Sequence, residues 1–141
     1  MKLFFSIIIP TLNEEKYLPG LLTDLSKQSY SSFEVIHIDA QSEDKTLVVA
    51  QKNARKLIFR QFVVNKRNVS LQRNFGAQKA QGQWLLFMDA DNRLPSFFLL
   101  GLKYQLEKSQ ALDKKPIELF TTLIHLYKTE NNQVADRKSV V

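Results

Sequence analysis

Short β-rich runs alternate with segments of helical hydrophobic periodicity along most of this chain. Strand and helix signals in strict succession are typical of right-handed βαβ crossovers, which place the strands side by side in a parallel sheet. The sequence therefore predicts an α/β fold, a mostly parallel sheet with flanking helices. The expected strands are 5–9, 33–38, 58–64 and 84–88, and the expected helices are 17–27, 42–54, 69–81 and 95–109.

Local signals set the expected ends of these elements. Pro10 is expected to stop the first strand, and Pro19 is tolerable only in the first turn of its helix. Ser42 is a candidate N-cap for the second helix, and Gly82 is expected to close the third.

The segment from Ile117 to Lys128 is ambiguous, because its leucines fit a helix while its β-branched residues favour a strand. We predict a strand followed by a loose polar tail. The expected organisation is one domain over residues 1–128 and a tail over 129–141.

Composition narrows the protein class. With 44% apolar and 24% charged residues, the chain has the balance of a soluble globular protein. The absence of cysteine excludes disulfides, thiolate zinc sites and thiol nucleophiles. The first apolar run is too short for a signal peptide and meets Pro10, and no run is long enough to span a bilayer. We expect a cytoplasmic protein, with peripheral membrane association left open.

Positive charge is concentrated in one block. Residues 45–88 carry nine basic side chains and no acidic one. Such a block can bind nucleic acid or phosphate, or can be a solvated basic helix face. The block lacks the interleaved aromatic residues of single-strand binders, so the solvated face is favoured and no nucleic-acid partner is expected.

The apolar run 84–88 leads directly into Asp89, Ala90 and Asp91. Ligands of open α/β sheets gather at the carboxyl ends of the strands. Side chains alternate along a strand, so we expect both carboxylates on one side, with the small Ala90 between them. Paired carboxylates suit Mg²⁺ or a similar cation that also binds substrate phosphates. The alternative is a solvated turn.

Other polar residues are expected at the same rim of the sheet. The loop from Pro10 to Glu15 offers backbone groups and carboxylates to a ribose or base. Asp39 follows the second strand and can accept a hydrogen bond from a uracil imide, or can cap the next helix. Arg73 can pair with a diphosphate or lie on the surface.

Rival motifs are missing from the sequence. There is no Gly-x-Gly-x-x-Gly, no glycine-rich phosphate loop ending in Gly-Lys-Ser/Thr, and no serine-hydrolase elbow. His37 and His125 form no metal pattern, and we interpret both as structural.

Four motifs together resemble the amino-terminal half of family-2 glycosyltransferases of the Rossmann-like GT-A fold. The resemblance covers roughly residues 4–110. The motifs are Ser6 to Glu15, Val35 to Asp39 with Ser42 to Thr46, Arg73 to Ala77 with Ala80 to Gly82, and Leu86 to Asp91.

This resemblance implies a nucleoside-diphosphate sugar as donor, UDP-sugars being favoured, and Mg²⁺ or Mn²⁺ held by Asp89 and Asp91. It further implies that the sugar is transferred to an acceptor hydroxyl. The implied site residues are Pro10, Thr11, Leu12, Glu14, Asp39, Arg73, Asp89, Ala90 and Asp91.

Family members carry the general base and the acceptor region well after the aspartate pair, whereas this sequence has fifty residues after Asp91. Relative to them the fold is expected to be truncated, and no general base is predicted. The alternative function is a non-catalytic nucleotide-sugar-binding module. Exposed apolar residues between Leu119 and Leu126 predict self-association or a carboxyl-terminal partner.

Overall fold

The computed structural model describes residues 2–111, 124–130 and 133–134, which contain six strands and four helices. The strands are Phe5–Thr11 (β1), Phe33–Asp39 (β2), Phe59–Val63 (β3), Trp84–Met88 (β4), Ile124–Glu130 (β5) and Gln133–Val134 (β6), and the helices are Leu18–Ser26 (α1), Thr46–Asn53 (α2), Val69–Lys79 (α3) and Phe98–Ala111 (α4). The sheet order is β3-β2-β1-β4-β5-β6. Strands β1 to β4 are parallel, and β5 and β6 are antiparallel to their neighbours. The predicted mostly parallel α/β sheet is confirmed.

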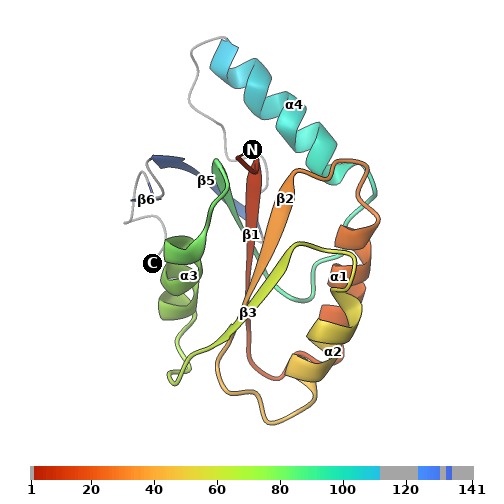
Figure 1. The fold of residues 1–141 in the computed structure, drawn as a ribbon, viewed down its shortest axis with the longest axis vertical. Helices are drawn as coiled ribbons and strands as arrows, with labels where there is room; N and C mark the ends of the chain where they lie inside the picture. Colours follow the sequence, from red (N-terminus) through yellow and green to blue (C-terminus); the bar gives the residue numbers. More distant parts are fainter. Residues whose placement is uncertain (1, 112–123, 131–132, 135–141) are drawn as a thin grey trace.

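Helices cover both faces of the sheet. Helix α3 lies on one side, and α1 and α2 lie on the other (Figure 1). Alternation along β1 matches this arrangement: Ile7 and Ile9 pack in the cluster that contains the α1 leucines, whereas Ile8 packs with Ala77 of α3. The central strands are buried on both faces, as the continuous apolar runs predict.

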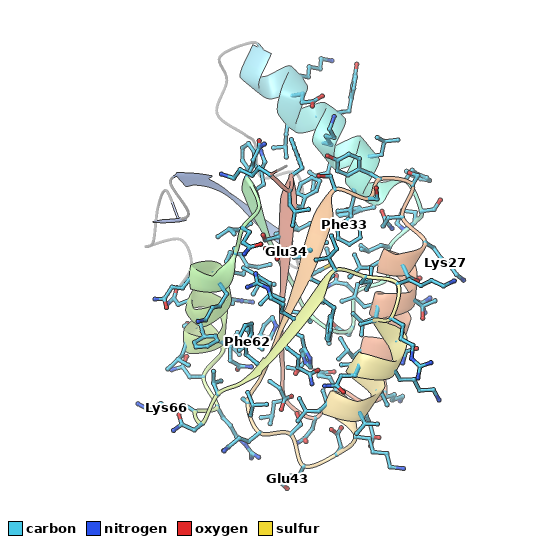
Figure 2. All side chains as sticks on the ribbon, in the orientation of Figure 1. Lys27, Phe33, Glu34, Glu43, Phe62 and Lys66 are labelled. Atoms are coloured by element: carbon cyan, nitrogen blue, oxygen red, sulfur yellow. The ribbon has the colours of Figure 1, made fainter. Side chains whose placement is uncertain are left out.

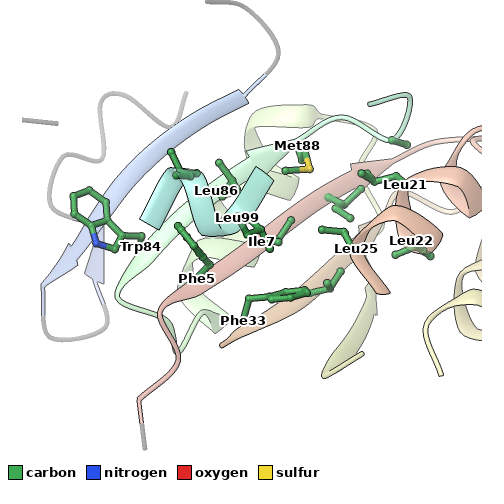
Figure 3. Packing of buried hydrophobic residues seen from close by; sticks show 14 of the residues in the cluster. Phe5, Ile7, Leu21, Leu22, Leu25, Phe33, Trp84, Leu86, Met88 and Leu99 are labelled. Atoms are coloured by element: carbon green, nitrogen blue, oxygen red, sulfur yellow. The ribbon is translucent and has the colours of Figure 1, made fainter. Parts of the chain in front are cut away.

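The larger core joins the sheet to α1 and α4. Leu18, Leu21, Leu22 and Leu25 recur at helical spacing in α1, and all four are buried. They pack with Leu99 of α4 and with the inward side chains of β1, β2 and β4 (Figure 3). Each fully buried leucine contributes about 1.5–3 kcal/mol relative to exposure. Helix α1 is therefore held mainly by its apolar face.

Strand β1 continues through Pro10 to Thr11, so the predicted stop at Pro10 is wrong. Proline can occupy a strand where its missing N–H leaves no partner unpaired. Pairing of β1 with β4 ends at Ile8, and β1 beyond that point pairs only with β2. The sheet is therefore open beside Pro10.

The chain beyond α4 is described only in part. Residues 124–130 form β5, in agreement with the predicted strand, while residues 117–123 lie outside the described residues. The strand continues past the predicted domain boundary at residue 128, and Gln133–Val134 pairs with it. The rest of the predicted tail and the side chains between Leu119 and Leu126 are not described. No helix in the described part is long and apolar enough to cross a bilayer.

Gly82 lies against the backbone of β1. A Cβ at this position would be 2.6 Å from the carbonyl carbon of Phe5 and 2.7 Å from the nitrogen of Ser6. Helix α3 already ends at Lys79, and no described glycine has a positive φ. Gly82 is thus required for the close approach of the α3–β4 loop to β1, and not to close the helix.

We predict that Gly82→Ala lowers the free energy of unfolding by about 1–3 kcal/mol, because the added methyl group forces β1 and the loop apart. Gly101→Ala in α4 is the matched control, since a Cβ there meets nothing within 4 Å. Alanine favours helices over glycine by up to about 1 kcal/mol, so the control should be neutral or stabilising. Urea unfolding measures both variants, and a neutral Gly82→Ala would contradict the close approach.

Candidate functional site

The carboxyl ends of β1 and β4 separate and leave a crevice. The chain proceeds from β1 outward to β2 and β3, then returns to place β4 on the other side of β1. Such a reversal of strand order is where open α/β sheets bind ligands. The β1–β2 register runs to Thr11 opposite Asp39, whereas the β1–β4 register ends at Ile8 opposite Phe87.

A pocket of about 320 Å³ opens at this crevice. Seven of the nine predicted site residues line it. Three further lining residues were not predicted, and no local pattern marks them: Arg67 in the loop after β3, and Val69 and Gln72 in α3. The lining residues are Pro10, Thr11, Leu12, Glu14, Arg67, Val69, Gln72, Asp89, Ala90 and Asp91.

Three carboxylates line the pocket, those of Glu14, Asp89 and Asp91, and together they are called the acidic wall. Asp89 and Asp91 follow the end of β4, where the chain turns and Ala90 is buried beneath them. Both side chains lie at the pocket because the chain turns after Met88. The predicted cause, alternation of side chains along an extended strand, does not apply, since β4 ends before Asp89. Burial raises the pKa of Glu14, and the nearby charges of Asp91 and Asp89 raise it further. The wall is therefore an environment that favours a bound cation.

The donor set limits how a metal can be held. Among the described residues, no three His, Cys, Asp or Glu side chains converge to bind a metal ion. Mg²⁺ is usually held by one or two protein carboxylates, with water and substrate phosphates completing its shell. Asp89 and Asp91 therefore fit a cation that arrives together with a phosphate ligand.

Arg73 lies next to Asp89. It projects from α3, and its Nη2 is 3.6 Å from Oδ1 of Asp89. Its Nε is buried and has no hydrogen-bond partner among the described residues. The structure brings Arg73 next to Asp89 but not into the pocket lining.

Thr11 is the centre of a buried network beneath the pocket. Its hydroxyl donates to Oδ1 of Asp39 at 2.7 Å and lies 2.6 Å from Nε2 of His37. Gln72 of α3 donates to the carbonyl oxygens of Thr11 and Ile38, at 3.0 and 2.9 Å. The network fixes the ends of β1 and β2 relative to each other.

The structure buries Asp39 completely and does not bring it to the pocket surface. Its carboxylate accepts from Thr11 and from the backbone N–H and hydroxyl of Ser42. The predicted capping role of Ser42 is wrong, because α2 begins at Thr46. The Ser42 hydroxyl instead holds Asp39 and accepts from the backbone N–H of Asn13.

The loop that carries Glu14 is fixed to the start of α2. The Asn13 side-chain oxygen accepts from the backbone N–H of Glu43 at 2.8 Å. The Glu14 backbone N–H donates to the hydroxyl of Thr46 at 2.9 Å. Asn13 has φ 54°, a left-handed conformation that asparagine tolerates better than most residues. These contacts place the Glu14 side chain at the pocket.

Comparison with known proteins identifies relatives of this chain. The model of the family described as glycosyl transferase family 2 matches residues 6–111. Poly(ribitol-phosphate) β-N-acetylglucosaminyltransferase TarS of Staphylococcus aureus is 38% identical over 92 residues, which are 62% of this chain and 16% of TarS. A PGL/p-HBAD biosynthesis glycosyltransferase of Mycobacterium tuberculosis is also 38% identical over 92 residues, 64% of this chain and 36% of that protein.

Solved structures show the same fold. Residues 1–349 of S. aureus TarS in complex with UDP match with a TM-score of 0.71 and 31% identity, over 77% of this chain and 33% of that one. A Pyrobaculum calidifontis mannosyltransferase in complex with GDP-Man and Mn²⁺ has a TM-score of 0.62 and 24% identity, over 67% of this chain and 29% of that one. The expected GT-A fold is confirmed. The chain spans about a sixth to a third of the length of these curated relatives.

We predict that Thr11→Val lowers the free energy of unfolding by about 1–3 kcal/mol, because the isosteric change leaves His37 without its hydroxyl partner and Asp39 with one donor fewer. Thr11→Ser is the control, since it keeps the hydroxyl and loses only a methyl group. Urea unfolding should show the larger loss for valine. A larger loss for serine would mean that the methyl contact, not the network, holds this position.

His37 should make the fold sensitive to mild acid. Burial lowers the pKa of His37 below its usual value near 6.5, so below that pH the unfolded chain binds a proton more readily than the folded chain. Stability should therefore fall as the pH drops from about 6.5 towards the folded pKa. Urea unfolding at pH 7.5 and 5.5 tests this, with His37→Gln as reference. Equal pH dependence in both proteins would contradict it.

Proposed function

Since the chain belongs to glycosyl transferase family 2, we propose that its pocket binds a nucleoside-diphosphate sugar and that the chain transfers the sugar to an acceptor hydroxyl. The observation that carries this proposal is the acidic wall of Glu14, Asp89 and Asp91 at the point where β1 and β4 separate. A crevice of this kind with carboxylates on one side suits a metal-bound diphosphate.

Asp89 and Asp91 would hold Mg²⁺ or Mn²⁺ in this proposal. The bound cation would neutralise the charge that develops on the leaving diphosphate. Arg73 contributes by its charge, since its Nη2 is 3.6 Å from Oδ1 of Asp89. The mannosyltransferase solved with GDP-Man and Mn²⁺ shares the fold that the proposal requires.

The nucleoside would lie against the end of β1. Pro10, Thr11 and Leu12 form that part of the pocket, and TarS of the same fold is solved with UDP and with UDP-GlcNAc. A UDP-sugar is therefore our preferred donor. Asp39 belongs to the proposed site indirectly, because its carboxylate fixes the Thr11 hydroxyl. We place the reaction in the cytoplasm, with peripheral membrane contact if the acceptor is lipid-linked.

A second candidate is a nucleotide-sugar-binding module without turnover. Among the residues that line the pocket, the only carboxylates are the three of the acidic wall. Asp89 and Asp91 are assigned to the proposed cation and Glu14 lies beside them, so the lining offers no carboxylate apart from this wall to accept the proton of an acceptor hydroxyl. Both the enzyme and the binding module bind the nucleotide sugar, and only the enzyme separates the sugar from the nucleotide.

We predict that UDP or GDP, or one of their sugar conjugates, raises the melting temperature by several degrees only when Mn²⁺ is present. A ligand at about a hundred times its dissociation constant stabilises the folded state by roughly 2.7 kcal/mol, which corresponds to such a shift. Asp91→Asn should abolish the metal-dependent part, because the cation loses a ligand. Thermal unfolding by circular dichroism measures the effect.

Glu107→Gln in α4 is the charge-matched control, because Glu107 pairs with Lys103 and does not line the pocket. This variant should keep the full shift. No shift with any nucleotide would contradict donor binding. Where binding is present, release of free UDP from the sugar nucleotide separates the enzyme from the non-catalytic module.

A further inference from the structure

The acidic wall comes from two separate loops of the chain. Glu14 lies in the loop between β1 and α1, whereas Asp89 and Asp91 lie in the loop between β4 and α4. The second loop is closed into a turn by Asn92, because its backbone N–H and its side-chain amide both donate to the carbonyl oxygen of Asp89, at 3.2 and 2.8 Å. The spacing of the three carboxylates therefore depends on what holds the two loops relative to each other.

Helix α1 is attached to the first loop at its amino end. The carbonyl oxygen of Glu14 accepts from the backbone N–H groups of Tyr17 and Leu18, at 3.2 and 3.0 Å. From there the helix runs away from the pocket. Figure 2 shows Lys27, the residue that follows α1, well apart from Glu43, which lies in the loop after β2. The position of Glu14 is thus tied to that of α1.

The same helix holds the second loop through Asp24. Its Oδ2 accepts from Nε of Arg93 at 2.7 Å and from the backbone N–H of Leu94 at 2.8 Å, and its Oδ1 accepts from Nη2 of Arg93 at 3.1 Å. The Asp24 side chain is only 13% exposed, so these hydrogen bonds are partly shielded from water. They anchor the chain two residues after Asp91.

Arg93 packs against the backbone of α1. A Cβ on Gly20, one helical turn before Asp24, would be 3.2 Å from Nη1 of Arg93 and 3.3 Å from its Cδ. The absence of a side chain at Gly20 therefore leaves room for the guanidinium beside the helix. A guanidinium that donates twice to one carboxylate fixes direction as well as distance, which a single ammonium group does not.

A second set of contacts fixes the far end of the same loop. The side chain of Gln28, just after α1, donates to the carbonyl oxygen of Pro95 at 2.8 Å and accepts from the backbone N–H of Leu99 at 3.0 Å. These contacts hold the start of α4. The contacts of Asp24 are closer in sequence to Asp91, so they act on the turn itself.

We propose that Asp24 and Arg93 are positioning residues for the acidic wall. Their ion pair attaches the backbone of the turn after β4 to α1, and α1 is in turn attached to the loop that carries Glu14. The inference rests on the proposed function, because it takes a cation and a diphosphate to bind at this wall. Neither Asp24 nor Arg93 lines the pocket, so the pair acts on the ligands without touching them.

The test measures how strongly Mn²⁺ improves the binding of a nucleoside diphosphate. Titration calorimetry gives the dissociation constants of UDP and of GDP with and without Mn²⁺, and the ratio for each nucleotide is its metal enhancement. We expect Arg93→Gln to lower this enhancement by about tenfold, the lower end of the range for residues that orient metal ligands. A merely structural role lowers stability and leaves the ratio unchanged.

The sign of the Arg93→Gln effect separates positioning from simple electrostatics. Arg93 is a cation two residues from Asp91, so its charge alone opposes a bound metal ion, and removing that charge should strengthen Mn²⁺ binding. Positioning predicts weaker binding instead. Arg93→Lys keeps the charge but loses the two-donor fork, and we expect it to lose most of the enhancement as well. The Arg93 side chain is 70% exposed, so neither substitution disturbs the core.

Asp24→Asn should reduce the enhancement to a similar extent. Combined with Arg93→Gln it should cause little further loss, as a double-mutant cycle requires for residues that act together. Glu107→Gln in α4 is the matched control, because it also replaces a paired carboxylate by an amide, while its partner Lys103 lies on the same helix. This control should keep the full enhancement.

An enhancement that Arg93→Gln and Arg93→Lys both leave intact would overturn the inference, and so would tighter Mn²⁺-dependent binding by Arg93→Gln. Fully additive losses in the double variant would overturn it as well. Failure of the proposed function looks different, since then the unaltered chain binds neither UDP nor GDP, or binds them without any effect of Mn²⁺. Circular dichroism confirms that each variant is folded, and the two Arg93 variants decide the outcome if Asp24→Asn does not fold.

Discussion

The site depends on the point at which β1 stops pairing with β4. The two strands are hydrogen-bonded up to Ile8 and Phe87, while β1 stays paired with β2 as far as Thr11. Because β4 ends while β1 continues, the chain after Met88 turns beside a stretch of β1 that is paired with β2 but not with β4. The crevice, the tolerance of Pro10 within a strand and the approach of both aspartates to the pocket all follow from this difference.

The floor of the pocket is held more firmly than its rim. Thr11, Asp39 and Gln72 are buried, and they form hydrogen bonds with one another, with the side chains of His37 and Ser42, and with backbone groups. An unpaired buried polar group costs about 1–3 kcal/mol, so a floor of this kind resists rearrangement. Arg67 and Asp91 at the rim are exposed. Under the proposed function, a fixed floor lowers the ordering cost of binding, while the rim groups adjust to the ligand.

Local sequence patterns predicted most of the fold, because apolar runs and helical periodicity indicate strands and helices without reference to distant residues. Strand β4 was predicted with its observed ends, since a short apolar run between the polar residues Gln83 and Asp89 is unambiguous once strands and helices alternate. Pro10 was misjudged because its tolerance depends on where a distant strand stops pairing. Gly82 was assigned the wrong role for a similar reason, since only the folded chain brings β1 against it.

The residues that line the pocket were predictable where a recognised sequence motif lies at the rim, as for Glu14 and Asp91. It was not predictable where neighbours decide which way a side chain points. Asp39 ends β2 as expected, yet Thr11 and Ser42 turn its carboxylate inward. Arg67 has no local signal, because a basic residue in a loop is usually solvated, and its position follows only from the contact with the loop after β2.

The charges of the pocket indicate how its ligands should depend on one another. Burial raises the pKa of Glu14, and the nearby negative charges of Asp91 and Asp89 raise it further. A diphosphate entering alone would add negative charge to this wall, whereas a cation entering alone would find too few protein ligands. Each therefore improves the site for the other, and linkage requires the improvement to be equal in both directions. Under the proposed function, metal and nucleotide bind as a mutually dependent pair.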